Sequence, residues 1–408
     1  MPLPGIGVFG TEREVKVLVP ILREKGFKIE AIWGRTIKEA EETAKELSIT
    51  FYTNKIDDVL LKKDVDLVFI NCPPYLHSQI SVKALGIGKH VLCNKPMGLG
   101  QSDGLKMVRG AQYYPSLISL VNYSLRFLPA FAQMKKALQE EYIGTSKVCI
   151  FILKLNPFFF IGPLNDISLI DIRVQMGSLL HDSYDWLCDS AMGGGALNLI
   201  GSHVIDLVTF LTGQRAVRVH GIVRTYTKTN QNVNGIRQIT APDFCNFQLE
   251  LDGGTLVTAS LHSNITSKSF SQEVLVCGQN GHLVVRGGDL FGQNNKNSSN
   301  EKEESLYVDV QDLHCTPLDS LLPRPYIKGL RKMIGALRES FQEHNNWIKE
   351  PVQAAANFED GLYVQAVIDS IQTSSINRNW VKVNIISESP TNHAKIMNAA
   401  RMAAVVMH

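Results

Sequence analysis

Short apolar strands alternate with amphipathic helices between about residues 5 and 144 of the chain. This alternation is typical of a parallel sheet whose strands are joined by helical crossovers. We expect strands at residues 5–9, 28–33, 65–71 and 90–93, because each is a short apolar run bounded by turn-forming or charged residues. The pattern therefore predicts a doubly wound α/β domain, to which we assign residues 1–125.

Beyond about residue 144 the pattern of expected elements changes to longer strands with few helices between them. Strands are expected at residues 216–226, 244–251, 255–262, 272–276 and 380–383, and helices at 326–343 and 354–373. This succession predicts a largely antiparallel sheet. We assign residues 126–385 to this second domain and residues 386–408 to a C-terminal tail.

Residues 156–175 form an apparent insertion in the second domain, because they fit no clean period. A lid and an oligomer contact are two interpretations of such a segment. A translated intron and a poorly ordered insertion are two others, and the sequence leaves all four open.

Composition narrows the choice of partner to a small molecule. Lys and Arg total 41 and Asp and Glu total 39, so no positive excess favours nucleic acid or an anionic membrane surface. We find no uninterrupted apolar run of the roughly 18–20 residues that a membrane span needs, and no spacing typical of a metal site. The 7 dispersed cysteines suit buried thiols in a reducing compartment, so a cytoplasmic location is expected. Three Asn-x-Ser/Thr triplets keep a secreted, matrix-associated scaffold as an alternative.

The turn after the first strand is a degenerate phosphate-binding turn. Gly5, Gly7 and Gly10 match G-x-G-x-x-G, but the first two lie inside the strand. A dinucleotide needs the glycines between strand and helix, where the backbone can approach the pyrophosphate. In that register only Gly10 remains, and Glu12 and Val15 occupy the other two glycine positions. A purely structural turn is therefore an equal alternative at this point.

Charge at two places bears on the identity of a bound nucleotide. Glu12 and Glu14 are unfavourable beside a phosphate at a helix N-terminus, and Arg13 offsets part of this repulsion. The second strand ends in Trp33-Gly34-Arg35-Thr36, with no acid to bind a ribose 2′-hydroxyl. Arg35 can pair with a 2′-phosphate, which favours NADP over NAD. The alternative is that Arg35 only begins a solvated helix, for which Thr36 is the expected N-cap.

A series of short motifs follows in a fixed order along the chain. They are Gly10, Gly34-Arg35, Asn71-Cys72-Pro73-Pro74-Tyr75-Leu76-His77, Asn94-Lys95-Pro96, Arg126-Phe127, Gly193-Gly194-Gly195, Gly201-Ser202-His203 and Glu359-Asp360-Gly361. Together they resemble the glucose-fructose oxidoreductase, inositol dehydrogenase and MocA family, over nearly the whole chain. Gly10-Thr11, Trp33-Gly34-Arg35-Thr36 and Leu125-Arg126-Phe127 are similar to the animal glucose-fructose oxidoreductase domain-containing proteins.

The resemblance implies a Rossmann domain, a nicotinamide cofactor and hydride transfer to or from a sugar-like carbinol. It implies Lys95 and His203 as the catalytic pair, and a homodimer or higher oligomer formed through the second sheet. The residues expected near the cofactor are Gly10, Thr11, Arg13, Trp33, Gly34, Arg35, Thr36, Asn71, Cys72, Pro73, His77, Asn94, Lys95 and Arg126.

The sequence departs from the family pattern at two acidic positions. Asn94 stands where the family has Glu, and Leu199 stands where an Asp usually precedes the histidine by four residues. A carboxylate beside a Lys and a His holds both in place and shapes their pKa values. Its loss leaves two classes of function open. One is an NADP(H)-dependent oxidoreductase with a degenerate active site, and the other is a protein that binds or senses NADP(H) without turnover.

Overall fold

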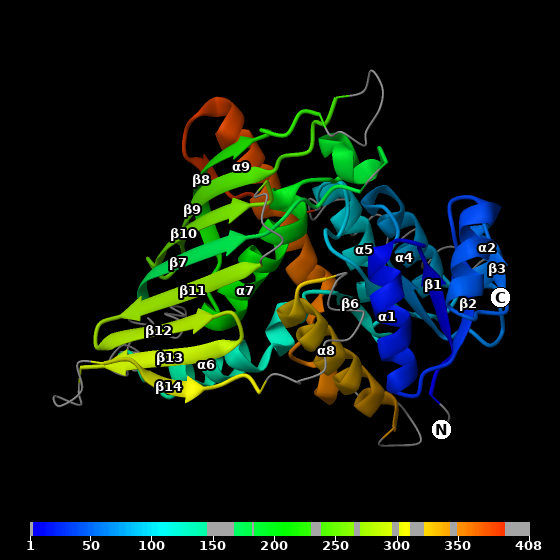
Figure 1. The fold of residues 1–408 in the computed structure, drawn as a ribbon, viewed down its shortest axis with the longest axis horizontal. Helices are drawn as coiled ribbons and strands as arrows, with labels where there is room; N and C mark the ends of the chain where they lie inside the picture. Colours follow the sequence, from blue (N-terminus) through cyan, green and yellow to red (C-terminus); the bar gives the residue numbers. More distant parts are fainter. Residues whose placement is uncertain are drawn as a thin grey trace, which may run out of the picture.

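Two sheets, each with its own helices, form two domains that lie side by side (Figure 1). The computed structural model describes residues 3–144, 167–181, 183–229, 238–264, 270–295, 302–310, 322–342 and 349–387. The predicted combination of a doubly wound parallel sheet with a largely antiparallel sheet is confirmed.

The N-terminal domain has a seven-stranded sheet in the order β15-β6-β5-β4-β1-β2-β3, parallel except for β15. The order reverses between β1 and β4, and open α/β sheets bind ligands at such a switch point, beyond the carboxyl ends of the strands. The strands are β1 (Ile6–Phe9), β2 (Ile29–Trp33), β3 (Tyr52–Thr53), β4 (Leu67–Ile70), β5 (His90–Cys93), β6 (Ser119–Val121) and β15 (Ala356–Asn357). The helices are α1 (Arg13–Glu24), α2 (Ile37–Glu46), α3 (Ile56–Leu60), α4 (His77–Gly86) and α5 (Gln101–Tyr113).

Thr36 caps helix α2, as its position predicts. Its hydroxyl accepts a hydrogen bond from the backbone N–H of Glu39 at 3.2 Å. The Glu39 carboxylate accepts a hydrogen bond from the Arg35 guanidinium at 2.8 Å. The arginine at the tip of β2 is therefore tied to the helix that follows it.

The second sheet has nine strands in the order β14-β13-β12-β11-β7-β10-β9-β8-β16, antiparallel except between β7 and β10. Its strands are β7 (Ile167–Gln175), β8 (Ala216–Arg224), β9 (Phe244–Leu251), β10 (Leu256–His262), β11 (Ser271–Gly278), β12 (Gly281–Arg286), β13 (Asp289–Asn294), β14 (Glu304–Tyr307) and β16 (Val381–Lys382). Helices α6 (Pro129–Gln139), α7 (Ser202–Thr212) and α9 (Phe358–Asn377) lie along the sheet (Figure 1).

Burial alternates along these strands, as period-two side chains require. In β9, Cys245, Phe247 and Leu249 are buried, whereas Asn246 and Gln248 are only partly buried. One face of the sheet therefore packs on the core and the other stays open. The pairing of two copies through the open face stays a prediction.

Residues Ile167–Gln175 correct the predicted insertion. They form β7, a central strand that pairs with β10 on one side and with β11 on the other. Ile170, Ile172 and Val174 alternate with more exposed residues, so the period-two pattern was present in the sequence and was missed. The assignment of an insertion was wrong for these residues, and residues 156–166 lie outside the described part of the chain.

Helix α8 (Arg324–Gln342) lies beside α1 in Figure 1, although it is far from α1 in the sequence. Its residues Ile327, Leu330 and Ile334 are buried in the same cluster as Val8 and Leu18 of the N-terminal domain. Strand β15 joins the N-terminal sheet as well. A single division between residues 125 and 126 therefore does not describe the two structural domains.

Among the described residues, one helical stretch, Ser190–Thr212, is long and apolar enough to cross a membrane by length and composition only. Of its most apolar window, 94% is buried inside the protein. The stretch ends in a π-helical turn, η5 (Leu197–Gly201), and helix α7, which pack against α9 as core elements of the second domain.

Candidate active site

A pocket of about 160 Å³ lies at the carboxyl ends of β1, β4 and β5. This is the switch point of the parallel sheet, where the fold places ligand sites. The second domain and helix α8 form the opposite wall. On the side of the parallel sheet the pocket is lined by Glu12, Arg13, Glu14, Asn71, Cys72, Asn94 and Lys95.

Lys95 has a carboxylate partner in this pocket, although the sequence suggested that none remained. Its ammonium group donates a hydrogen bond to Glu14 Oε1 at 2.7 Å, and its side chain is 12% exposed. Asn94 Nδ2 contacts the other oxygen of Glu14 and donates to Asn71 Oδ1 at 2.5 Å. Burial opposes ionisation of Glu14, but the nearby Lys95 outweighs it and lowers the pKa of Glu14. Helix α1 thus supplies a negative charge that position 94 does not.

Glu12, which lies in the same turn as Glu14, is bound by a different donor. The indole N–H of Trp186 donates to Glu12 Oε1 at 2.5 Å. Burial raises the pKa of Glu12 to about 7, and the charge of Glu14 adds to this effect. At neutral pH the turn therefore carries less negative charge than its sequence suggests.

The Glu12→Gln variant is expected to be more stable than the natural protein at pH 8, by about 1–3 kcal/mol. Because the pKa of Glu12 is higher in the folded chain, the folded state binds more protons than the unfolded state between about pH 4.5 and 7. Stability from this group is therefore lost as pH rises through that window, and glutamine removes the loss. Urea unfolding at pH 5 and pH 8 measures the difference.

The exposed residue Glu140 provides the matched control, since its carboxylate is 64% exposed and lies 3.7 Å from Lys136. Glu140→Gln is expected to change stability little and equally at both pH values. An equal gain for Glu12→Gln at pH 5 and pH 8 would contradict the assignment of a raised pKa.

His203 lies behind the pocket. The residue is 2% exposed, and its ring stands edge-on to Tyr123 and Tyr326, with centroid distances of 5.8 and 4.9 Å. Burial, with the charge of Lys95 as a smaller cause, lowers the pKa of His203 well below its usual value, so the imidazole is neutral. Its Nδ1 atom has no hydrogen-bond partner in the structure. His203 is not among the residues that line the pocket, but Tyr326 contacts His203 and also lines it.

The glycines at the ends of β1 and β2 are required by close packing. Gly10 has φ +130°, and a Cβ there would collide with the backbone carbonyl of Asn71. A Cβ at Gly34 would meet the backbone nitrogen of Ala40 at 2.8 Å. Both glycines keep the turns tight against neighbouring backbone, which leaves the carboxyl edge of the sheet open to a ligand.

The β2 tip holds the residues predicted to recognise the nucleotide. The Arg35 side chain is 67% exposed, whereas Trp33 is 6% exposed and packs against Phe9 at a ring distance of 6.1 Å. The Thr36 hydroxyl already accepts the hydrogen bond that caps helix α2. Among these residues, Arg35 is the one whose charge faces solvent.

His77 ties two loops together beneath the pocket. Its ring nitrogens lie 2.7 Å from the carbonyl oxygen of Cys72 and 3.0 Å from that of Pro96. The residue is 1% exposed. It therefore fixes the loops after β4 and β5. Pro73 lies in the first of these loops, directly before η1 (Pro74–Leu76). Thr11 lies in the turn after β1.

Arg126 lies outside the residues that line the pocket. Its guanidinium makes two hydrogen bonds to the Asp206 carboxylate, Nε to Oδ2 at 2.8 Å and Nη2 to Oδ1 at 2.6 Å. Asp360 lies 3.3 Å from the same guanidinium. The structure therefore places Arg126 in a buried ion pair that joins η2 (Ser124–Phe127) to α7 and α9, and does not bring it to Lys95.

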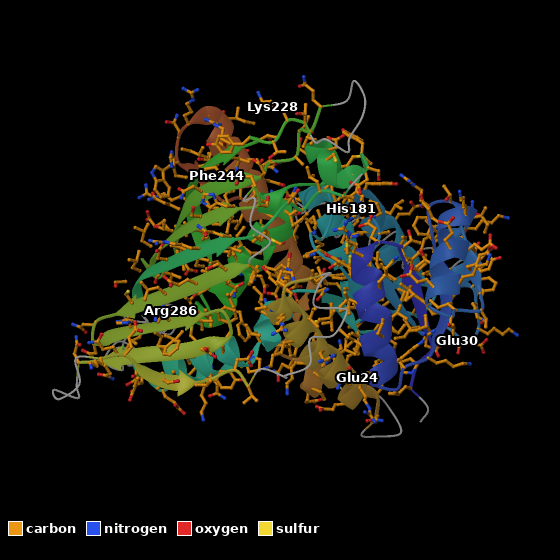
Figure 2. The ribbon with its side chains drawn as sticks, viewed as in Figure 1. Glu24, Glu30, His181, Lys228, Phe244 and Arg286 are labelled. Carbon is orange, nitrogen blue, oxygen red and sulfur yellow. The ribbon has the colours of Figure 1, made fainter. Side chains whose placement is uncertain are left out.

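Sequence reasoning missed the side chains of the opposite wall. Trp186 and His181 come from the second domain, and Figure 2 labels His181 where the two domains meet. His181 Nδ1 lies 2.5 Å from Asp185 Oδ2, and this hydrogen bond raises the pKa of His181. Tyr326 comes from α8, far along the chain. No local pattern could have revealed it, because the packing of α8 against the N-terminal domain sets its position.

Comparison with known proteins identifies the family. Residues 5–120 match the model of an oxidoreductase family with an NAD-binding Rossmann fold, and residues 162–284 match the Gfo/Idh/MocA C-terminal domain. The chain belongs to the Gfo/Idh/MocA oxidoreductase family. It is 46% identical over 395 residues to glucose-fructose oxidoreductase domain-containing protein 2 of Mus musculus, covering 95% of each chain. It is 44% identical to glucose-fructose oxidoreductase domain-containing protein 1 of Xenopus tropicalis, covering 95% of this chain and 94% of the other.

Solved structures share the Gfo/Idh/MocA fold. Levoglucosan dehydrogenase, in complex with NADH and L-sorbose, superposes with a TM-score of 0.75 at 17% identity, covering 95% of this chain and 100% of that chain. The aldose-aldose oxidoreductase of Caulobacter crescentus gives a TM-score of 0.67 at 17% identity, covering 93% and 99%. The family is one of nucleotide-binding oxidoreductases related to sugar dehydrogenases.

The pocket suits the nicotinamide nucleotide that the family binds. Gly10 lets the turn approach a pyrophosphate, and Asn71, Asn94 and Lys95 present amide and ammonium groups at the strand ends. The two unfavourable acids of the turn are each held by a donor, Glu12 by Trp186 and Glu14 by Lys95. These contacts reduce the repulsion expected from the sequence.

Proposed function

We propose that this protein binds NADP(H) at the carboxyl edge of its parallel sheet and transfers hydride between the cofactor and a carbinol or carbonyl group. The observation that carries the proposal is the Lys95–Glu14 pair at 2.7 Å in the pocket at the switch point. Gly10, Asn71, Cys72 and the other residues at the strand ends would hold the nucleotide there.

The chemistry balances as a two-electron transfer. A bound nicotinamide would supply the hydride acceptor for an alcohol: the carbinol carbon would give up its C–H hydride, the C=O double bond would form, and the unprotonated Lys95 amine would accept the hydroxyl proton. In the reverse direction the Lys95 ammonium donates a hydrogen bond, and then a proton, to the carbonyl oxygen. Glu14 holds that ammonium group in place and Asn94 holds Glu14. A positioned acid or base of this kind contributes about 10²- to 10⁴-fold to the rate.

The preference for NADP over NAD is assigned to Arg35. Its exposed guanidinium stands at the β2 tip, and hydrogen bonds to a charged group contribute about 1.5–3 kcal/mol. Arg35→Ala is therefore expected to weaken NADPH binding by about 10- to 100-fold and NADH binding by less than about threefold. Calorimetric titration with each nucleotide measures both constants.

The Glu39→Gln variant is the matched partner of this experiment. Glu39 holds the Arg35 guanidinium at 2.8 Å, so removing its charge frees the arginine for a 2′-phosphate. NADPH should then bind more tightly while NADH binding stays the same. Equal losses for both nucleotides in Arg35→Ala would refute the assignment.

A second candidate function is NADP(H) binding without turnover, in which the nucleotide is a structural or regulatory ligand. It is favoured by the two altered positions, Leu199 and Asn94, which remove the expected carboxylates from their usual places. Incubation of the purified protein with NADPH and a panel of carbonyl compounds and sugars, and with NADP⁺ and a panel of polyols, separates the two functions. Bound NADPH that no compound oxidises would favour the second.

A further inference from the structure

Glu12 stands where a bound dinucleotide would place its negative charge. It lines the pocket and is the N-cap residue of α1, the helix that follows the first strand of the NAD-binding Rossmann fold. In such folds the pyrophosphate lies at the N-terminus of this helix, where backbone N–H groups point outward and the helix dipole favours an anion. An ionised Glu12 carboxylate would repel a pyrophosphate at that place.

The Glu12 side chain does not cap α1. Over residues 11–16, all of which the structure describes, its carboxylate makes no hydrogen bond to the first turn of the helix. It accepts a hydrogen bond instead from the Trp186 indole of the second domain, at 2.5 Å. The N–H groups at the start of α1 therefore keep their capacity for another acceptor, and the carboxylate is held beside them.

Trp186 is a fixed donor, because the segment that carries it is anchored twice. The Asp185 carboxylate caps η3 (Trp186–Cys188), and its other oxygen is bonded to His181 Nδ1 at 2.5 Å. Gly194 packs so closely on η3 that a Cβ there would lie 2.8 Å from the Trp186 carbonyl oxygen. The indole N–H therefore stays in place at the turn.

A neutral carboxyl group at position 12 can do what a carboxylate cannot. The ionised group is only an acceptor, whereas the protonated group keeps a carbonyl oxygen as acceptor and gains an O–H donor. The carbonyl oxygen can keep the hydrogen bond from Trp186 while the O–H group donates to a phosphate oxygen. Protonation thus turns a repulsive group into a binding group. Burial favours the protonated form, since it raises the pKa of Glu12 to about 7.

The other ionisable groups around Glu12 come from three parts of the fold. They are Arg13 and Glu14 of α1, His181 and Asp185 of the second domain, and Cys72 and Lys95 of the loops after β4 and β5. Lys95 is bonded to Glu14 at 2.7 Å, and His181 is bonded to Asp185. The bond to Asp185 raises the pKa of His181, so this histidine needs a variant of its own in the test.

We propose that Glu12 binds the pyrophosphate of the nucleotide in its protonated form, so that binding of NADP(H) takes up a proton from solution. Glu12 is then a binding residue of the cofactor site, and the affinity for the nucleotide falls as pH rises. The place of the pyrophosphate rests on the proposed function, whereas the bond between Glu12 and Trp186 does not.

Calorimetric titration with NADP⁺ at pH 6 and pH 8 tests the proposal. A pKa of about 7 leaves Glu12 about nine-tenths neutral at pH 6 and about one-tenth neutral at pH 8. Because only the neutral fraction binds, the affinity of the natural protein is expected to be about tenfold lower at pH 8. Titrations at pH 8 in two buffers of different ionisation enthalpy should show uptake of about one proton per nucleotide.

Glu12→Gln is the decisive variant, because glutamine is neutral at both pH values and keeps an acceptor and a donor. At pH 8 it is expected to bind NADP⁺ about tenfold more tightly than the natural protein does, with proton uptake close to zero. The 2′-phosphate of the nucleotide titrates with a pKa of about 6, but it does so with both proteins, so the comparison removes its effect. Equal affinities and equal proton uptake of the two proteins at pH 8 overturn the proposal.

Three further variants separate Glu12 from its neighbours. His181→Gln should keep the proton uptake at pH 8. Uptake that is lost in His181→Gln and kept in Glu12→Gln would assign the proton to the histidine and overturn the proposal. Trp186→Phe removes the N–H group that favours the ionised carboxylate, so the pH at which the affinity begins to fall is expected to rise. Glu140→Gln, at an exposed carboxylate, should behave like the natural protein.

The two proposals can fail separately. If NADP⁺ binds and Glu12→Gln keeps the pH dependence of the natural protein, the proposed function stands and the role of Glu12 fails. If NADP⁺ binds to neither the natural protein nor Glu12→Gln at either pH value, the proposed function fails and the role of Glu12 falls with it.

Discussion

Arg126→Met is expected to lower the free energy of unfolding by about 3–5 kcal/mol. Arg126 and Asp206 are 8% and 1% exposed, and two hydrogen bonds of 2.8 and 2.6 Å join them. Removing the guanidinium leaves the Asp206 carboxylate buried without its main partner, and this is far more costly than losing a surface pair. Urea unfolding monitored by circular dichroism measures the change.

The control for this experiment removes both charges. Arg126→Met combined with Asp206→Leu leaves no buried carboxylate without its partner and is expected to recover most of the lost stability. The exposed pair Lys136–Glu140, at 3.7 Å, should contribute less than about 1 kcal/mol when broken. A single variant as stable as the natural protein would show that the pair does not hold η2 against α7. A cofactor role for Arg126 would instead appear as weaker NADPH binding in a variant of normal stability.

Lys95→Met is expected to reduce hydride transfer by about 10²- to 10⁴-fold while the fold is kept. The lysine is the ammonium donor at the strand ends, and Glu14 is its partner at 2.7 Å. The methionine side chain has a similar length and can occupy the space of the lysine side chain without a charge. The turnover number with a compound that oxidises NADPH in the panel above measures the loss, and the fluorescence of bound NADPH reports a change at the pocket independently of turnover.

Lys16→Met is the matched control, because Lys16 stands on the same helix as Glu14 and pairs with Glu46 at 2.6 Å. It should leave turnover and fluorescence unchanged. Glu14→Gln keeps a hydrogen bond to Lys95 but removes the charge, so a smaller loss of turnover is expected than for Lys95→Met. Unchanged turnover and unchanged fluorescence in Lys95→Met would contradict a place for Lys95 at the nicotinamide.

Much of the N-terminal domain could be predicted from local sequence. The strands at 65–71 and 90–93 contain β4 and β5, and the Thr36 cap opens α2, because hydrophobic period and turn residues act over a few positions. The position of Lys95 follows as well, since a residue directly after a parallel strand lies at the carboxyl edge of the sheet. The strands of the second sheet were harder to predict from the sequence. The segment that forms β7 was mistaken for part of an insertion, although buried and more exposed residues alternate along it.

The sequence by itself determined the class of fold and the lysine that follows the strand at residues 90–93, because these depend on patterns within short segments. Only the tertiary structure decided which groups meet Lys95. It brought Glu14 of α1 to Lys95 and Tyr326 of α8 to the lining of the same pocket, and it placed Arg126 on Asp206. The physical reason is that ion pairs and pocket walls join side chains that are close in space but distant along the chain, and no periodicity in the sequence records that closeness.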